Sequence, residues 1–302
     1  MDKVLVIGGP TAVGKTQLSI ELAQKFDGEI ISGDSMQVYR KLDIGTAKVT
    51  PEEMQNIPHH LIDIKDIHDE YSTHEFQQKG RQLITEITNR GKLPIVAGGT
   101  GLYIQSLLYD FHLGNVPNDR AKKQFYEDYL AKYGSEKLWQ LLAEKDAQTA
   151  AKIHPHNPRR IVRALEVIDN GGYIEQDTKP ELLYDAKIIA LNTDRQLLYE
   201  RINLRVDKML EQGLLDEAKY VYEAGDVQGA KAIGYKEFFA YFRGEQKLDE
   251  AVELLKQQSR RYAKRQITWF KNRLNADWYD LLLDEQAKEN LIADVERWLK
   301  NE

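Results

Sequence analysis

The fold of this chain is indicated most clearly by one octapeptide, Gly9-Pro10-Thr11-Ala12-Val13-Gly14-Lys15-Thr16. It matches the phosphate-binding pattern G-x-x-x-x-G-K-[ST] at every fixed position. A short run rich in β-branched residues, Lys3–Ile7, comes before it, and apolar residues at helical spacing follow it over Thr16–Phe26. Strand, glycine loop and helix in that order are the context that makes the pattern credible. The stretch therefore predicts a phosphate cradle in an α/β domain rather than a chance glycine turn.

Each residue type in this loop has a chemical role. Glycines allow backbone N–H groups to converge on phosphate oxygens, and the following helix contributes positive potential at its N-terminus. Lys15 can neutralise phosphate charge, and the Thr16 hydroxyl can hold Mg²⁺. We predict that the eight residues from Gly9 to Thr16 bind a diphosphate, with Mg²⁺ as the cofactor held through Thr16.

The surrounding sequence extends this domain. We predict strands at Glu29–Ser32, Leu93–Ala97 and Lys187–Leu191, a possible strand at His60–Ile64, and a helix at Phe76–Asn89. Strands that alternate with helices are typical of a parallel sheet covered by helices. The predicted fold class is therefore α/β, with a P-loop parallel-sheet core.

An all-helical stretch interrupts the core. We predict its helices near Asp119–Tyr133, Ser135–Glu144, Ala147–Ile153 and Pro158–Asp169, the last with Asn157 as N-cap and two glycines after its end. The predicted domains are residues 1–113 with 184–302 as the core, which has a helical C-terminal part, and residues 114–183 as an all-helical insertion domain.

Composition limits the class of protein. The 302 residues include no cysteine, so disulfides and thiolate metal sites are excluded. The chain has neither a recognisable signal peptide nor an apolar run long enough to span a membrane, which predicts a soluble cytoplasmic protein. The net charge of −6 argues against nucleic acid as a partner, because phosphate backbones attract Lys and Arg.

One segment departs from that charge balance. Residues 254–276 contain no acid but carry Lys256, Arg260, Arg261, Lys264, Arg265, Lys271 and Arg273. Helical spacing places Lys256, Arg260, Lys264 and Lys271 on one side, beside an apolar stripe. We expect a docked helix with a basic outer face, which by itself is more typical of a solvated surface than of RNA binding.

An acid follows the second predicted strand. Asp34 would then lie at the carboxyl end of a parallel strand, beside the phosphate loop, where ligands bind in such sheets. It could act as a general base or ligate Mg²⁺, or it could simply cap the next turn.

Several segments together resemble bacterial tRNA dimethylallyltransferases, also called tRNA isopentenyltransferases. They are GPTAVGKT at Gly9, ISGDSMQVY at Ile31, DIGTAK at Asp43, HHLID at His59, GGTGLYIQ at Gly98, IHPHNPRRIVRALE at Ile153, AIGYKE at Ala232 and RRYAKRQITWFKNR at Arg260. They are spread over nearly the whole chain. The DSMQ and GGT segments and the basic C-terminal run are far more specific than a P-loop.

The resemblance implies a reaction. Members of the family transfer dimethylallyl from dimethylallyl diphosphate to N6 of the adenine 3′-adjacent to the tRNA anticodon, position 37. By similarity, the catalytic residues are Asp34, Lys15, Thr16, Thr100 and Arg205, with Asp34 as the base and Arg205 on the diphosphate. The residues implied to contact tRNA are Asp34, Ser35, Met36, Gln37, Thr100, Lys123, Arg159, Arg160, Ile161, Val162 and Arg163. Lys123 stands where the family commonly has arginine, which keeps the charge but loses the bidentate geometry.

Other functions remain open on the sequence. A prenyltransferase acting on free AMP or ADP needs the same core but neither the insertion nor the basic helix. A P-loop kinase of a small metabolite is a further alternative, and an RNA-binding module without activity ranks last. The expected partners are the tRNA anticodon stem-loop and dimethylallyl diphosphate, and we expect a monomer.

Overall fold

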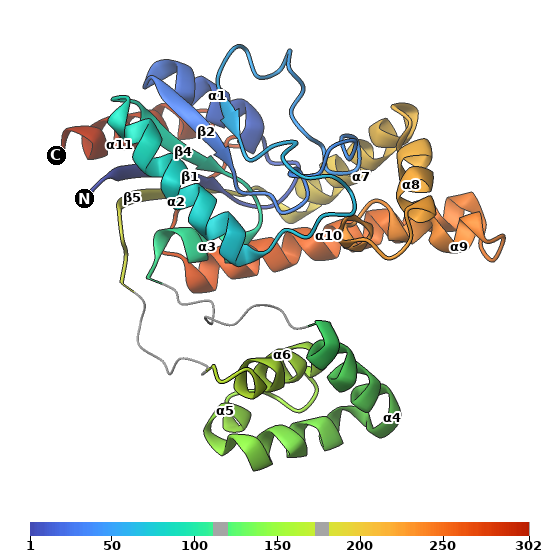
Figure 1. The fold of residues 1–302 in the computed structure, drawn as a ribbon. Helices are drawn as coiled ribbons and strands as arrows, with labels where there is room; N and C mark the ends of the chain where they lie inside the picture. Colours follow the sequence, from blue (N-terminus) through green and yellow to red (C-terminus); the bar gives the residue numbers. More distant parts are fainter. Residues whose placement is uncertain (111–119, 173–180, 302) are drawn as a thin grey trace. The chain divides into compact units, whose positions relative to one another are not determined.

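The computed structural model describes residues 1–110, 120–172 and 181–301. Its contacts divide into two compact units, Met1–Asp110 with Glu181–Glu302, and Phe111–Pro180. The predicted insertion, 114–183, differs from the second unit by three residues at each end, 114 against 111 and 183 against 180. Figure 1 draws both units, and each is described here by itself.

A parallel sheet forms the centre of the first unit (Figure 1). Within the described residues its strand order is β3-β2-β4-β1-β5-β6, and every pair is parallel. The strands are β1 (Lys3–Gly8), β2 (Gly28–Ser32), β3 (His59–His60), β4 (Leu93–Ala97), β5 (Asp185–Leu191) and β6 (Asp277–Tyr279). The α/β prediction is confirmed.

Helices cover both faces of this sheet. In the first unit they are α1 (Lys15–Lys25), α2 (Thr73–Asn89), α3 (Gly101–Leu108), α7 (Arg195–Glu211), α8 (Leu214–Glu223), η1 (Gln228–Lys231), η2 (Lys236–Phe238), α9 (Phe239–Phe242), α10 (Leu248–Arg273) and α11 (Ala287–Lys300). Val4 and Val6 of β1 pack into a core shared with α2, α3 and α10. Leu5 and Ile7 pack on the opposite face, against α1, α7 and α11. Burial on both faces explains why β1 is apolar without alternation.

The second unit is helical within its described residues. It contains α4 (Arg120–Lys145), α5 (Ala147–Ala151) and α6 (Pro158–Asp169). The two helices predicted on either side of Gly134 are confirmed: α4 consists of two helical segments separated by non-helical backbone at that glycine, which has φ 83°. Apolar side chains of α4 and α6, among them Leu138 and Leu165, form a core of their own. The bounds of α6 agree with the prediction, although Asn157 makes no side-chain capping bond.

Two predicted elements have different bounds in the structure, and two further elements were not predicted. The strand predicted at His60–Ile64 is reduced to β3, because Leu61 and Asp63 have positive φ and turn the chain away. Helix α2 begins at Thr73 rather than Phe76, since the Ser72 hydroxyl accepts a hydrogen bond from the backbone N–H of Glu75 and caps it. The edge strand β6 and the helix α3 were not predicted.

Candidate active site

The phosphate loop joins β1 to α1. Gly9 and Gly14 have φ of 126° and 97°, values that suit glycine. A side chain at Gly9 would also place its Cβ 2.3 Å from the carbonyl oxygen of Leu191 on the neighbouring strand. Helix α1 then begins at Lys15. The loop therefore has the backbone shape in which N–H groups and a helix N-terminus can receive an anion.

Lys15 is the cation at the centre of this loop. Its ammonium donates a hydrogen bond of 2.6 Å to the carbonyl oxygen of Pro10. The pKa of Lys15 is lowered to about 7, chiefly by burial and secondly by the charge of Arg205, while Asp34 acts in the opposite direction. A lysine with this pKa is only partly protonated at neutral pH, and a bound diphosphate would favour its charged form.

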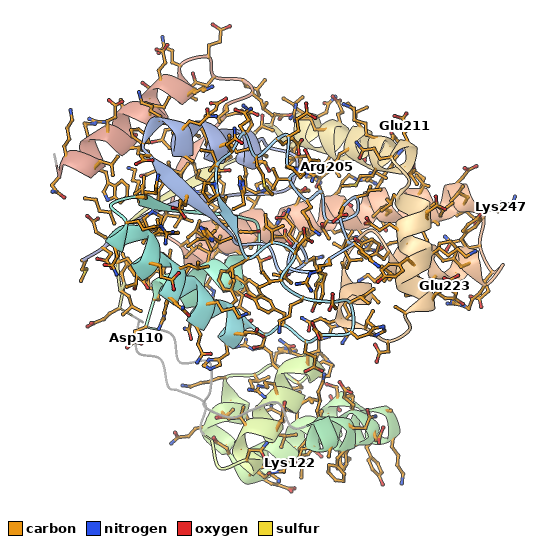
Figure 2. All side chains as sticks on the ribbon, turned by 45° about the horizontal axis from the view of Figure 1, so that its top comes forward. Asp110, Lys122, Arg205, Glu211, Glu223 and Lys247 are labelled. Carbon is orange, nitrogen blue, oxygen red and sulfur yellow. The ribbon has the colours of Figure 1, made fainter. Side chains whose placement is uncertain are left out.

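Two arginines of α7 contact the same loop. Arg205 donates to the Thr11 hydroxyl at 3.0 Å, and Arg201, one turn earlier, donates to the Ala12 carbonyl at 2.8 Å. Figure 2 labels Arg205 on α7. Burial lowers the pKa of Arg205, and Asp34 opposes that shift. The guanidinium predicted to hold the diphosphate thus lies at the cradle.

Asp34 follows β2 at the same edge of the sheet. One of its carboxylate oxygens accepts a 2.8 Å hydrogen bond from the backbone N–H of Met36. Burial raises the pKa of Asp34, and this outweighs the opposing effects of that hydrogen bond and of the charges on Lys15 and Arg205. The carboxylate and the cationic cradle therefore interact electrostatically. A raised pKa also makes Asp34 a stronger base than an exposed aspartate.

A third loop, Gly98-Gly99-Thr100 after β4, holds the Asp34 segment in place. Strand β4 lies between β1 and β2, so its carboxyl end separates the cradle from Asp34. The Thr100 hydroxyl accepts a hydrogen bond of 3.2 Å from the backbone N–H of Ser35, and the Thr100 N–H donates to Gly33 at 3.2 Å. The structure thus brings together the predicted residues of three strand ends: the cradle, Asp34 with Ser35, and Thr100.

A glycine substitution tests how tightly these loops pack. A Cβ at Gly98 would lie 2.4 Å from the backbone carbonyl of Gly33, whereas a Cβ at Gly33 would meet nothing closer than 3.5 Å. We expect Gly98→Ala to lower the free energy of unfolding by about 1–3 kcal/mol or more, because backbone must move, and Gly33→Ala to change it little. Urea unfolding of both variants measures this, and equal losses would contradict the packing described.

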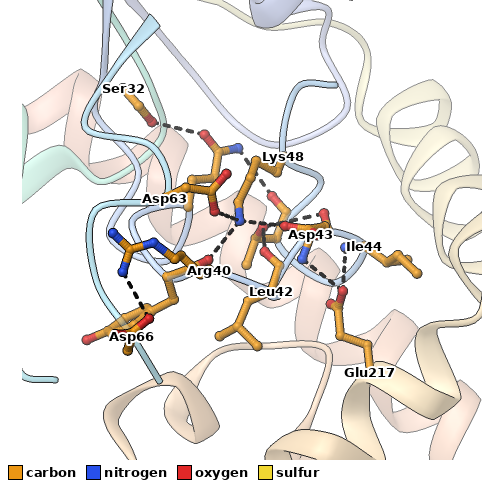
Figure 3. A network of polar contacts seen from close by, with 12 residues as sticks. Ser32, Arg40, Leu42, Asp43, Ile44, Lys48, Asp63, Asp66 and Glu217 are labelled. Carbon is orange, nitrogen blue, oxygen red and sulfur yellow. Dashed lines mark hydrogen bonds and ion pairs between the residues drawn. The ribbon is translucent and has the colours of Figure 1, made fainter. Parts of the chain in front are cut away.

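Gln37, predicted to grip the adenine, belongs to a polar network in which Figure 3 labels Ser32, Lys48 and Glu217. Its amide oxygen accepts from the Ser32 hydroxyl at 2.9 Å, and its amide nitrogen donates to the carbonyls of Thr46 and Ala47 at 3.3 Å each. Both ends of the amide are therefore engaged, and hydrogen bonds to a base edge would require some of these contacts to be exchanged.

The same network contains two residues that sequence reasoning missed. The buried Lys48 ammonium donates to Tyr39 O and to the carboxylates of Asp43 and Asp63, at 2.5–2.7 Å. Glu217 of α8 accepts hydrogen bonds from the backbone N–H groups of Asp43, Ile44 and Gly45 and from the Tyr235 hydroxyl. Lys48 lies in the quoted DIGTAK segment, but Glu217 lies in no quoted motif. Only the fold brings it to the loop that supports Gln37.

The predicted tRNA-contacting residues on the second unit differ in exposure. Lys123, Arg159 and Arg160 are exposed. Arg163 pairs with the buried Glu166 at 3.0 Å. Ile161 and Val162 are buried in the core of the unit. Their side chains pack α6 against that core, so the prediction that they contact tRNA is not supported for these side chains.

Helix α10 corrects the prediction for its basic face. Lys256 pairs with Asp207 at 2.7 Å and Arg260 donates to Asn203 at 2.6 Å, so both face α7 rather than solvent. The exposed basic residues are Arg261, Lys264, Arg265, Lys271 and Arg273. Ala263 and Phe270 are buried, which confirms that the helix is docked on the core.

The donors at the phosphate loop can be compared with the ligands that Mg²⁺ requires. Among the described residues, no three acidic or histidine side chains form a group that could hold a metal ion. Mg²⁺ usually keeps several waters and is bound by one or two protein ligands together with substrate phosphates. The exposed Thr16 hydroxyl at the start of α1 fits that manner of binding, in which the substrate supplies other oxygens.

Together the fold and site define a P-loop α/β protein in which the cations at the loop interact electrostatically with a partly buried carboxylate. In addition, no helix among the described residues is long and apolar enough to cross a membrane. The family model described as "IPP transferase" matches residues 37–273. The chain belongs to the IPP transferase family.

Relatives and solved structures agree with this assignment. The chain is 56% identical to the tRNA dimethylallyltransferase of Enterococcus faecalis, over 99% of this chain and 98% of the relative. It is 53% identical to that of Geobacillus kaustophilus, over 93% and 91%. The structure of the full-length tRNA isopentenylpyrophosphate transferase of Bacillus halodurans matches with TM-score 0.76 and 45% identity, covering 100% of this chain and 98% of that one. A eukaryotic dimethylallyltransferase acting on tRNA matches with TM-score 0.85 and 33% identity, covering 100% and 80%.

Proposed function

We propose that this enzyme transfers a dimethylallyl group from dimethylallyl diphosphate to N6 of the adenine 3′-adjacent to the anticodon, position 37 of tRNA, with release of diphosphate. Dimethylallyl transfer to tRNA follows from the family and from the names of its relatives. The observation that carries the proposed chemistry is the electrostatic interaction of Asp34 with Lys15 and Arg205. A base and an anion cradle side by side suit an alkylation that takes a proton from the nucleophile and expels an anion.

The residues divide the chemistry between them. The N6 amine of adenine forms a bond to C1 of the dimethylallyl group while the bond from C1 to the diphosphate oxygen breaks. Asp34 takes the N6 proton, which addresses the poor nucleophilicity of an exocyclic amine. Lys15, Arg205 and the loop N–H groups stabilise the negative charge on the departing diphosphate. Mg²⁺ bound by Thr16 and the diphosphate would supply further positive charge there.

The acceptor must leave its base stack to reach Asp34. Unstacking costs a few kcal/mol, which contacts around the extruded base have to offset. Ser35 and Met36 follow Asp34, and Thr100 accepts a hydrogen bond from Ser35, so these residues and Gln37 are our candidates for such contacts. Arg159, Arg160 and Lys123 of the insertion are exposed and suit contacts to RNA phosphates.

Labelled donor tests the proposal. The protein is incubated with radiolabelled dimethylallyl diphosphate and unmodified tRNA that carries adenine at position 37, and with the same tRNA carrying guanine there. We expect label only in the first RNA. No label in a tRNA that a related enzyme modifies would overturn the proposal. Competition by AMP or ADP for the label, or ATP turnover without prenyl donor, would favour the free-nucleotide and kinase alternatives.

Donor binding should depend on pH through Lys15. Its pKa of about 7 in the free enzyme means that the side chain loses its proton as pH rises through neutrality, while bound diphosphate favours the protonated form. We therefore expect donor binding to take up protons above pH 7 and affinity to fall as pH rises. Calorimetry in buffers of different ionisation enthalpy measures the uptake. Lys15→Arg is the matched control, because arginine stays charged and should reduce the uptake to that of the other groups.

A further inference from the structure

A single buried side chain on α10 spans two loops of the site. The Gln266 amide oxygen accepts a 3.1 Å hydrogen bond from the backbone N–H of Thr11, and its amide nitrogen donates a 3.0 Å bond to the carbonyl of Gly99. The residue is 5% exposed. Both functional ends of the amide are thus used, each on a different loop.

The two loops carry the two halves of the site. Thr11 belongs to the diphosphate cradle, and its hydroxyl accepts from Arg205. Gly99 directly precedes Thr100, whose hydroxyl accepts from Ser35, the neighbour of Asp34. Gln266 therefore connects the donor cradle with the segment that holds the base.

The packing around Gln266 leaves little room for these loops to shift. A Cβ at Gly99 would lie 2.0 Å from the Gln266 amide nitrogen, and one at Gly101 would lie 2.2 Å from the Trp269 ring. A Cβ added at Gly8, at the end of β1, would likewise lie 2.0 Å from the Phe270 ring. Residues 266, 269 and 270 form one stripe of α10, so this helix rests directly on the backbone of both loops.

We propose that Gln266 is a positioning residue for prenyl transfer, which sets the separation between the diphosphate cradle and Asp34. The proposal rests on the proposed function. Gln266 touches no reacting atom, and its effect is on the geometry in which donor and acceptor meet. A misplacement of about 1 Å can cost about 10²-fold in rate even when both substrates still bind.

Gln266→Leu tests this by separating rate from binding. We expect the single-turnover rate of transfer, with both substrates saturating, to fall about 10²-fold. The dissociation constants of dimethylallyl diphosphate and of tRNA, each measured alone, should change by less than about threefold, because the binding groups remain. Gln77→Leu is the matched control: Gln77 is a buried glutamine of α2 that donates to the carbonyl of Ser106 at 2.7 Å. The Gln77→Leu enzyme should have a lower free energy of unfolding but the wild-type single-turnover rate of transfer.

Gln266→Glu gives a second readout, the pH dependence of the transfer rate, which a loss of stability alone would not change. Its ionised carboxylate would place an acceptor against the Gly99 carbonyl, whereas the protonated acid can donate there as the amide does. The ratio of variant to wild-type rate, measured well below both melting temperatures, should therefore rise as pH falls. Gly99→Ala should reproduce the Gln266→Leu kinetics from the opposite side of the contact.

The outcomes separate the two claims. A Gln266→Leu enzyme that transfers at the wild-type rate, or that loses rate only in proportion to donor or tRNA affinity, would overturn the positioning role and leave the proposed function intact. Failure of the wild-type protein to label tRNA would instead overturn the proposed function.

Discussion

Replacement of Asp34 by asparagine is expected to lower the rate of prenyl transfer at saturating substrates by about 10²–10⁴-fold, the range that a positioned general base contributes. Asparagine keeps the size of the side chain and can still accept the hydrogen bond from the Met36 N–H, but it cannot take the N6 proton. Single-turnover transfer of labelled dimethylallyl to tRNA measures the loss.

The controls separate chemistry from folding and from binding. The melting temperature of Asp34→Asn should not fall, because the substitution removes a carboxylate whose pKa is raised by burial and keeps its hydrogen bond. Asp66→Asn, which changes an exposed carboxylate paired with Arg40, should leave the rate unchanged. A rate within tenfold of wild type for Asp34→Asn would mean that another group accepts the proton.

Replacement of Arg205 by alanine should lower the transfer rate by about 10²–10³-fold, as expected for loss of one preorganised group that stabilises developing charge. It also removes the hydrogen bond to the Thr11 hydroxyl in the cradle. Arg205→Lys should recover only part of this rate, because lysine restores the charge but not the planar fork. Arg195→Ala, an exposed arginine of the same helix that packs over Tyr199, is the control.

A second measurement identifies the cause of the Arg205 effect. Because the charge of Arg205 lowers the pKa of Lys15, its removal should raise that pKa, and proton uptake on donor binding should move to higher pH. Arg205→Ala protein with wild-type proton uptake would indicate that the guanidinium acts too far from Lys15 to share its diphosphate.

Local signals were enough for much of the fold. The bounds of β4 and α6 agree with the prediction, because a buried apolar run determines the first, and a proline at its first position and a glycine stop determine the second. The edge strand β6 was not predicted because its three residues are mostly exposed. Pairing with β5, rather than their own composition, makes them a strand. The break between two helical segments at Gly134 was predicted as well, because a glycine adopts positive φ without strain.

The phosphate loop and the α/β class could be predicted from the chain alone, because both follow from local patterns of residues, whereas the role of Asp34 was implied by the resemblance to a known family. Which distant side chains complete the site could be learned only from the folded structure. Glu217, Lys48 and Gln266 act on loops through backbone N–H groups and carbonyls, and such contacts leave no spacing signal in the sequence. The same holds for Lys256 and Arg260, whose basic character predicts an outer face but which are directed toward α7 by their partners on that helix. Burial and partner geometry depend on how elements pack, and this is a property of the whole fold.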